Sequence, residues 1–191
     1  MIVNGAFRRL AVVASVVGAL GVLPACRSGA SKVSSDPNQR IYRNPTADFG
    51  KLKGLTLHFV SVTTNNNEGV DLVKSAFVDS LKTHMASKFG EVSEGDSAPA
   101  GGAVLDVSVR VNWGSRAARA IVGYGAGRAG IEINYDLKDA SGSLLAKLHV
   151  TDRMSGGFYG GNAKELAFAA SSKWDRYFAE TVLVNAAPTG S

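Results

Sequence analysis

The residue with the most sharply defined chemistry in this sequence is its single cysteine, Cys26. One thiol cannot form a disulfide within the chain, and zinc sites built on paired cysteines or iron–sulfur clusters lack their ligands. The residues before it have the layout of a secretory signal, with Arg8 and Arg9 followed by an apolar run from Leu10 to Leu23. This run of 14 residues is shorter than the roughly 20 that a membrane-spanning helix needs. We therefore expect an exported chain without a permanent membrane span.

The four residues that end at the cysteine, Leu23-Pro24-Ala25-Cys26, resemble the lipobox of bacterial lipoproteins. The resemblance implies that a diacylglyceryl group alkylates the Cys26 thiol and that the signal is cleaved between Ala25 and Cys26. Fatty-acid chains such as palmitate, at about 0.8 kcal/mol per buried CH₂, would hold the chain on a membrane. Because Arg27 rather than an aspartate follows the cysteine, the resemblance favours the outer membrane, facing the periplasm.

The net charge of the chain is small and argues against a nucleic-acid partner. The formal net charge of +5 falls to +3 when residues 1–25 are removed, since these contain two arginines and no acid. Basic residues and aromatic residues do not cluster as they do in nucleic-acid binders, so we expect no nucleic-acid partner. The expected partners are the membrane, through the lipid on Cys26, and an envelope protein complex.

Three histidines, His58, His84 and His149, are the remaining candidates for acid–base or metal chemistry. They lack the spacing of metal ligands, and no Gly-x-Ser-x-Gly elbow marks a nucleophilic serine. Thiol catalysis is excluded because the lipid would consume the only cysteine. Two of the three histidines could still be near neighbours on a sheet. Because the residue count does not exclude Ser-His-Asp catalysis, an unrecognised hydrolase stays as the least favoured alternative. We expect no enzyme, no metal and no cofactor.

Alternating and helical patterns predict the elements that position these residues. Apolar residues alternate with polar ones as in strands, or recur every three to four positions as in helices. The predicted order is a strand at 55–62, a helix at 70–89, a strand at 105–113, a hairpin at 131–150 with its turn at 139–142, and a helix at 164–184. The predicted fold class is α/β (α+β), a mainly antiparallel sheet of about four strands with two helices packed on one face.

The chain divides into four predicted regions. These are the lipoprotein signal peptide (1–25), the lipidated cysteine with a flexible tether (26–50), a single α/β domain (51–185) and a C-terminal tail (186–191). The tether is rich in Ser, Gly, Asn, Asp and Pro, a composition typical of flexible linkers. Its residues Ile41, Tyr42 and Phe49 are apolar enough for its second half to lie against the domain.

A glycine-rich segment, 114–130, connects two of the predicted strands. The spacing of Gly125, Gly127 and Gly130 matches a dinucleotide-binding loop, but the segment leads into a strand instead of opening a helix, so a pyrophosphate site is not expected. Arginine and tyrosine are favoured at protein contacts. The candidate partner contacts are therefore Arg116, Arg119, Tyr124 and Arg128, and the alternative is a solvated loop whose arginines pair with nearby acids.

This glycine-rich segment, with the strand pair around Asp139-Ala140-Ser141-Gly142, resembles the bacterial lipoprotein family known as domain of unknown function 4410. The resemblance covers roughly residues 50–184 and implies an exported α/β domain without an established activity. We expect a membrane-anchored, non-catalytic interaction or assembly module of the envelope. The alternative is a periplasm-facing lipoprotein that binds a small ligand, which a deep apolar pocket would support.

Overall fold

The computed structural model describes residues 38–65, 67, 69–114, 129–154 and 163–184. The predicted signal peptide, Cys26 with its cleavage site, and the C-terminal tail lie outside the described residues. So do the four candidate partner contacts, Arg116, Arg119, Tyr124 and Arg128.

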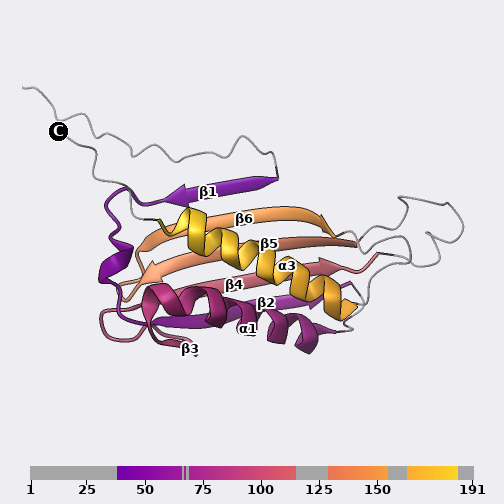
Figure 1. Cartoon of the computed structure of the whole chain (residues 1–191), viewed down its shortest axis with the longest axis horizontal. Coiled ribbons are helices and arrows are strands. Elements are labelled where there is room, and N and C mark those ends of the chain that lie inside the picture. Colours follow the sequence, from indigo (N-terminus) through magenta and orange to yellow (C-terminus); the bar gives the residue numbers. More distant parts are fainter. Residues whose placement is uncertain (1–37, 66, 68, 115–128, 155–162, 185–191) are drawn as a thin grey trace, which may run out of the picture.

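Six strands form one sheet in the order β1-β6-β5-β4-β2-β3 (Figure 1). Strand β2 is parallel to both of its neighbours, β3 and β4, and the remaining pairs are antiparallel. Their bounds are β1 Gln39–Arg43, β2 Leu55–Thr64, β3 Val92–Glu94, β4 Ala103–Asn112, β5 Ala129–Asp139 and β6 Leu144–Met154.

The prediction of a mainly antiparallel sheet of about four strands was therefore wrong, although the α+β class holds. The two additional strands, β1 and β3, have five and three residues, too few for an alternating pattern to be recognised. The parallel pairs arise because helix α1 (Val70–Phe89) carries the chain back along β2, so that the next strands start at the same end as β2.

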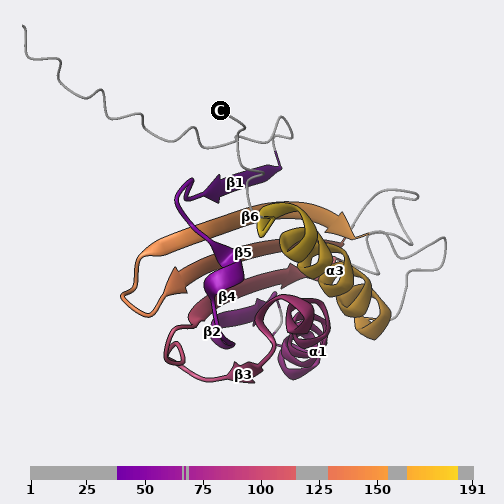
Figure 2. The same ribbon diagram turned by 60° about the vertical axis from the view of Figure 1, so that its left-hand side comes forward.

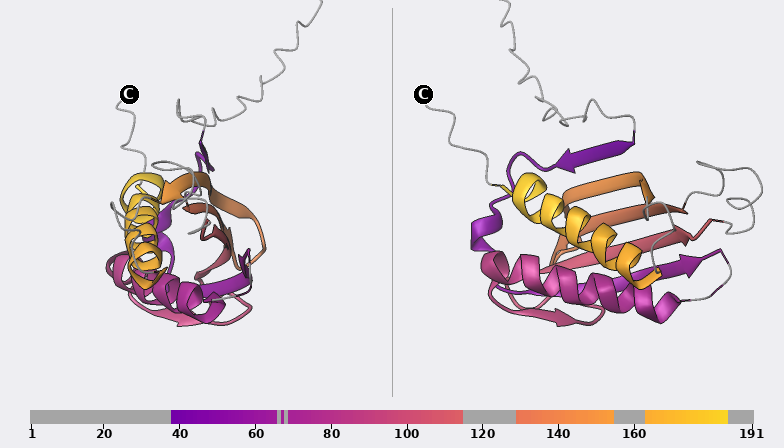
Figure 3. Two further views of the ribbon diagram at one scale, coloured as in Figure 1. Left: turned by 90° about the vertical axis from the view of Figure 1, so that its right-hand side faces the viewer. Right: turned by 45° about the vertical axis from the view of Figure 1, so that its right-hand side comes forward.

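The two helices cover one face of the sheet and pack against each other (Figures 1 and 3). Helix α3 (Ala163–Tyr177) continues into a π-helical turn, η2 (Phe178–Val182). Helix α1 begins after Gly69 and ends at Gly90, both with positive φ angles, and Gly90 N–H bonds to the Ala86 carbonyl. Both helices lie where the apolar periodicity predicted them.

The core lies between the helices and the sheet. Alternate residues of the central strands point into it and are fully buried, including Leu105, Val107, Ile133, Tyr135 and Leu148. They meet the buried side of the helices, which includes Phe77, Leu81, Met85, Trp174 and Phe178. The other alternate residues lie on the sheet face away from the helices, which we call the open face.

The second half of the predicted tether contacts the domain. Strand β1 pairs with β6, so that Ile41 lies opposite Leu148 and Tyr42 opposite Lys147. A short 3-10 helix, η1 (Phe49–Lys51), follows and buries Phe49. Within the described chain, no helix has the length and apolar character to cross a membrane.

Candidate functional site

Polar side chains gather on the open face around Asp106 of β4. One carboxylate oxygen lies 2.8 Å from His58 Nδ1, and the other accepts from Lys138 Nζ at 2.6 Å. Partial burial acts to raise the pKa of Asp106, but the hydrogen bonds from Lys138 and His58 together outweigh it, so that the pKa lies below its usual value. The hydrogen bond to Asp106 raises the pKa of Lys138. Asp106 thus joins His58 and Lys138 across three adjacent strands.

The same pattern recurs further along the open face. Lys147 Nζ lies 3.1 Å from the Asp136 carboxylate, and His149 Nδ1 lies 2.7 Å from Asn134 Oδ1. These contacts join β5 to β6, as the contacts of Asp106 join β2, β4 and β5. Cross-strand pairs of this kind stabilise a sheet and fix its register.

The histidines do not come together. His58 and His149 lie on strands, as predicted, but β4 and β5 separate their strands, so the idea that they are near neighbours is wrong. His58 Nε2 faces the Asp96 carboxylate at 3.8 Å, and His84 is half-buried on α1. Among the described residues, no three His, Cys, Asp or Glu side chains converge as a metal site would require.

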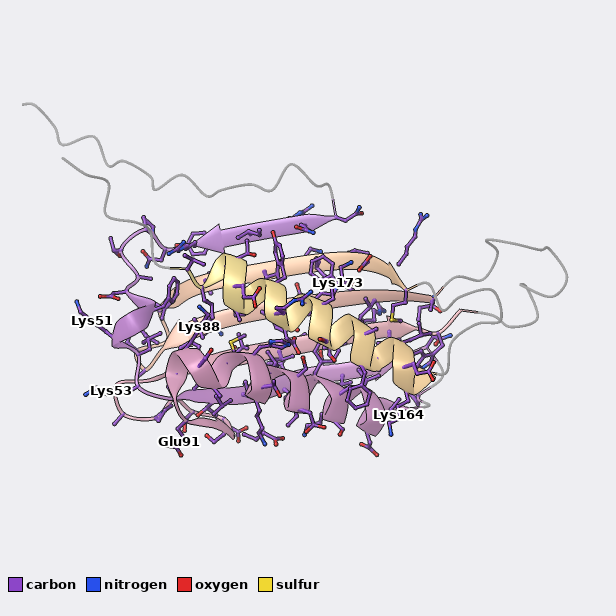
Figure 4. The ribbon with its side chains drawn as sticks, viewed as in Figure 1. Lys51, Lys53, Lys88, Glu91, Lys164 and Lys173 are labelled. Carbon is purple, nitrogen blue, oxygen red and sulfur yellow. The ribbon has the colours of Figure 1, made fainter. Side chains whose placement is uncertain are left out.

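A groove lies between the start of β1, the end of β6 and the helical pair α3–η2. Its volume is about 440 Å³ and its lining is mainly polar: Asn38, Gln39, Thr151, Asp152, Lys173, Trp174, Arg176, Tyr177, Glu180 and Thr181. Lys173, labelled in Figure 4, donates to Asp152 at 2.6 Å, and the Trp174 indole N–H donates to the same oxygen at 3.0 Å. Asp152 therefore joins α3 to β6 in the wall of the groove.

Another group of polar side chains lies inside the core. The sequence analysis did not predict it. The Tyr135 hydroxyl of β5 donates to Asp175 Oδ1 of α3, and both residues are fully buried. Asp175 Oδ2 and the nearby Ser80 hydroxyl of α1 are buried and have no hydrogen-bond partner among the described residues. Burial, opposed by the Ser80 and Tyr135 hydroxyls, raises the pKa of Asp175 to about 8. The sequence does carry a signal for this burial, because Asp175 lies next to Trp174 and three residues before Phe178, both on the predicted apolar face of the helix.

Comparison with solved structures shows this fold elsewhere at low sequence identity. The PelC dodecamer from Paraburkholderia phytofirmans has a TM-score of 0.50 and 15% identity, covering 72% of this chain and 96% of that one. A dodecamer of a PelC point variant from the same organism has a TM-score of 0.46 and 15% identity, covering 74% and 95%. A PDZ domain protein from Parabacteroides distasonis has a TM-score of 0.45 and 8% identity, and the match covers 75% of this chain but only 36% of that protein.

Among curated proteins nothing matches this chain. A family model does match, over residues 30–157, which is well over half of the sequence. The match includes the glycine-rich segment and the hairpin turn whose resemblance predicted it. The chain therefore belongs to the family described as domain of unknown function 4410.

Proposed function

We propose that this chain is a lipid-anchored, non-catalytic module of the bacterial envelope that works by assembling with copies of itself and with an envelope protein complex. The lipid on Cys26 would hold it at the outer membrane, with the domain facing the periplasm. The observation that carries the proposal is the sheet itself, whose open face and two edge strands are left uncovered by the described residues (Figure 2). Proteins usually cover or blunt a sheet edge, because unpaired strands invite pairing with another chain.

Two further observations support this proposal. The ionisable groups that could have suggested catalysis, His58, Asp106 and Lys138, are bound to one another. The PelC structure that shares this fold is described as a dodecamer, and we extend self-assembly to the present chain as part of the proposal.

The binding of a small polar ligand is a second candidate, favoured by the groove between β1 and α3. Arg176 and Glu180, about one helical turn apart, contribute a cation and an acid to its lining. Thermal melting of the purified domain with a panel of amino acids, sugars and nucleotides tests this candidate. A ligand that raises the melting temperature of the wild type but not of Arg176→Ala would support it, and no shift with any compound would count against it.

Fatty-acid labelling with membrane fractionation tests the anchor. We expect labelled wild-type protein in the outer-membrane fraction and no label on Cys26→Ala. Arg27→Asp is a matched control, because it keeps the lipidated cysteine and is expected to move the labelled protein to the inner membrane. A soluble, unlabelled wild type would refute the anchor.

Light scattering of the detergent-solubilised wild type tests self-assembly. A monomeric wild type would refute the self-assembly part of the proposal.

The candidate contacts in the glycine-rich segment stay a prediction. We expect the pair Arg116→Ala with Arg119→Ala to weaken capture of an envelope partner, since arginine is favoured at protein contacts. Crosslinking followed by pull-down from intact envelopes measures this. Equal recovery of the same partners by the wild type and the double variant would show that the arginines belong to a solvated loop.

A further inference from the structure

The outer edge of β1 presents unpaired backbone groups. On its inner side, Thr151 N–H donates to the Asn38 carbonyl at 2.9 Å, and Asn44 N–H donates to the Leu145 carbonyl at 2.8 Å. In an antiparallel pair alternate residues direct their backbone groups to the partner. The even-numbered residues of β1 therefore face β6, and Gln39, Ile41 and Arg43 direct their N–H and C=O groups outward, where no described strand pairs with them.

The opposite edge of the sheet is formed by β3. Leu55 N–H donates to the Glu91 carbonyl at 2.9 Å, and Gly95 N–H donates to the Leu57 carbonyl at 3.2 Å. The odd-numbered residues of this segment therefore face β2, and Val92 and Glu94 direct their backbone groups outward. Strand β3 pairs with β2 only at residues 55–57, so that the described chain leaves the rest of this β2 edge open as well.

The two edges also differ in charge. We call residues 39–43 the basic edge, because they include Arg40 and Arg43 and no acid. Residues 91–96 form the acidic edge, with Glu91, Glu94 and Asp96 and no base. The guanidinium of Arg43 lies over the Phe49 ring, so the exposed Arg40 supplies the outward charge of the basic edge. Lys82 of α1 lies 3.1 Å from Glu94, which leaves Glu91 and Asp96 to face a partner. Both are exposed, although His58 Nε2 lies 3.8 Å from the Asp96 carboxylate.

We infer that copies of this chain assemble head to tail, with the basic edge of one copy added to the acidic edge of the next. The inference rests on the proposed self-assembly and names its surfaces. The β1 strand runs opposite to β3. When successive copies are related by a rotation about an axis parallel to the strands, the strand directions are kept. Strand β1 of one copy then lies antiparallel to β3 of the next, and the sheet continues from copy to copy. Two unlike surfaces make a heterologous contact, which closes into a ring or continues as a filament.

Substitutions on each edge test this arrangement in the detergent-solubilised full chain, measured by light scattering and sedimentation. Arg40→Glu blocks the basic edge, and Glu91→Lys with Asp96→Lys blocks the acidic edge. Each variant alone should be monomeric at concentrations at least tenfold above those at which the wild type assembles. An equimolar mixture of the two should assemble again, because the intact edges are complementary and the two reversed edges also carry opposite charges.

A second variant separates loss of assembly from loss of folding. Ile41→Pro removes an outward N–H to which no described strand is paired, and edge strands tolerate proline at such a position. It should abolish assembly and leave the domain folded by circular dichroism at room temperature, with a lower melting temperature because the half-buried Ile41 side chain packs against the core. Arg110→Glu is the matched control, because it reverses an exposed charge in the middle of the sheet and should assemble like the wild type.

The outcomes distinguish this inference from the proposed function. A monomeric wild type would refute the self-assembly on which both rest. An oligomeric wild type with equally oligomeric Arg40→Glu and Ile41→Pro variants would overturn the edge contact and leave self-assembly intact. If Arg110→Glu dissociates the oligomer and the edge variants do not, the edge contact would also be overturned, and the contact between copies would be assigned to the open face.

Discussion

Asp175 is a carboxyl group that the fold keeps inside its core. Its described neighbours are the hydroxyls of Tyr135 and Ser80 rather than a positive charge. Removing an ion from water is costly unless an opposite charge accompanies it, and burial accordingly raises the pKa of Asp175 to about 8. At neutral pH the side chain is therefore mainly an uncharged acid that accepts the hydrogen bond of Tyr135 and joins α3 to β5.

This raised pKa predicts a specific pH dependence. Between the usual pKa of 3.8 and the folded value of about 8, the folded state keeps a proton that the unfolded state loses, so the free energy of unfolding falls as the pH rises. Asp175→Asn removes this contribution. Its free energy of unfolding relative to the wild type should therefore rise across that window, by at most about 1.4 kcal/mol per pH unit.

Urea unfolding of both proteins at pH 5, 6, 7 and 8 measures this difference. Asp79→Asn is the control, because it removes an exposed carboxyl from α1 and should leave the pH dependence of the wild type unchanged. Parallel stability curves for the wild type and Asp175→Asn would contradict the buried neutral acid.

At the level of the elements, the sequence was informative where structure is local. Helix α1 has the predicted bounds because its apolar spacing and its flanking glycines act within the segment. The hairpin was predictable because Asp139 Oδ1 accepts from the N–H groups of Ser141 and Ser143, which closes the turn. Strands β1 and β3 were not predictable, since they are held by neighbours distant in the sequence. The Tyr135–Asp175 pair, 40 residues apart, was missed for the same reason.

The connection into β4 depends on a glycine for steric reasons. A Cβ atom on Gly102 would lie 2.6 Å from the Gly54 carbonyl oxygen and 2.7 Å from that of Lys53. Both oxygens belong to the backbone, which cannot move without disturbing the start of β2. We expect Gly102→Ala to lower the free energy of unfolding by about 2–3 kcal/mol, as overpacking does, measured by urea unfolding.

Gly130 of β5 provides the comparison for that substitution. A Cβ atom there would lie 3.7 Å from its nearest neighbour, the Asp152 carbonyl oxygen, which is an ordinary contact. Gly130→Ala should therefore change stability by less than about 1 kcal/mol, chiefly through the unfolded chain. Equal losses at both positions would show that glycine flexibility, and not the close approach at Gly102, sets the cost.

For the whole molecule, the proposed lipid on Cys26 and the two sheet edges would act on the same assembly equilibrium. An anchor confines the copies to one surface, which raises the concentration that each edge encounters without adding a contact. Confinement also orients the domains alike, as a head-to-tail contact requires. Membrane attachment should therefore promote assembly at expression levels where a soluble form of the same domain stays monomeric.

An unanchored chain tests this coupling directly. A cleavable non-lipoprotein signal in place of residues 1–25, combined with Cys26→Ala, exports the domain without its lipid. At equal expression, amine-reactive crosslinking of intact cells should give a ladder of oligomers for the anchored chain and mainly monomer for the unanchored one. Arg40→Glu in the anchored chain should also give monomer, because it removes the contact and keeps the anchor. Ladders of equal intensity with and without the lipid would show that the edges alone drive assembly.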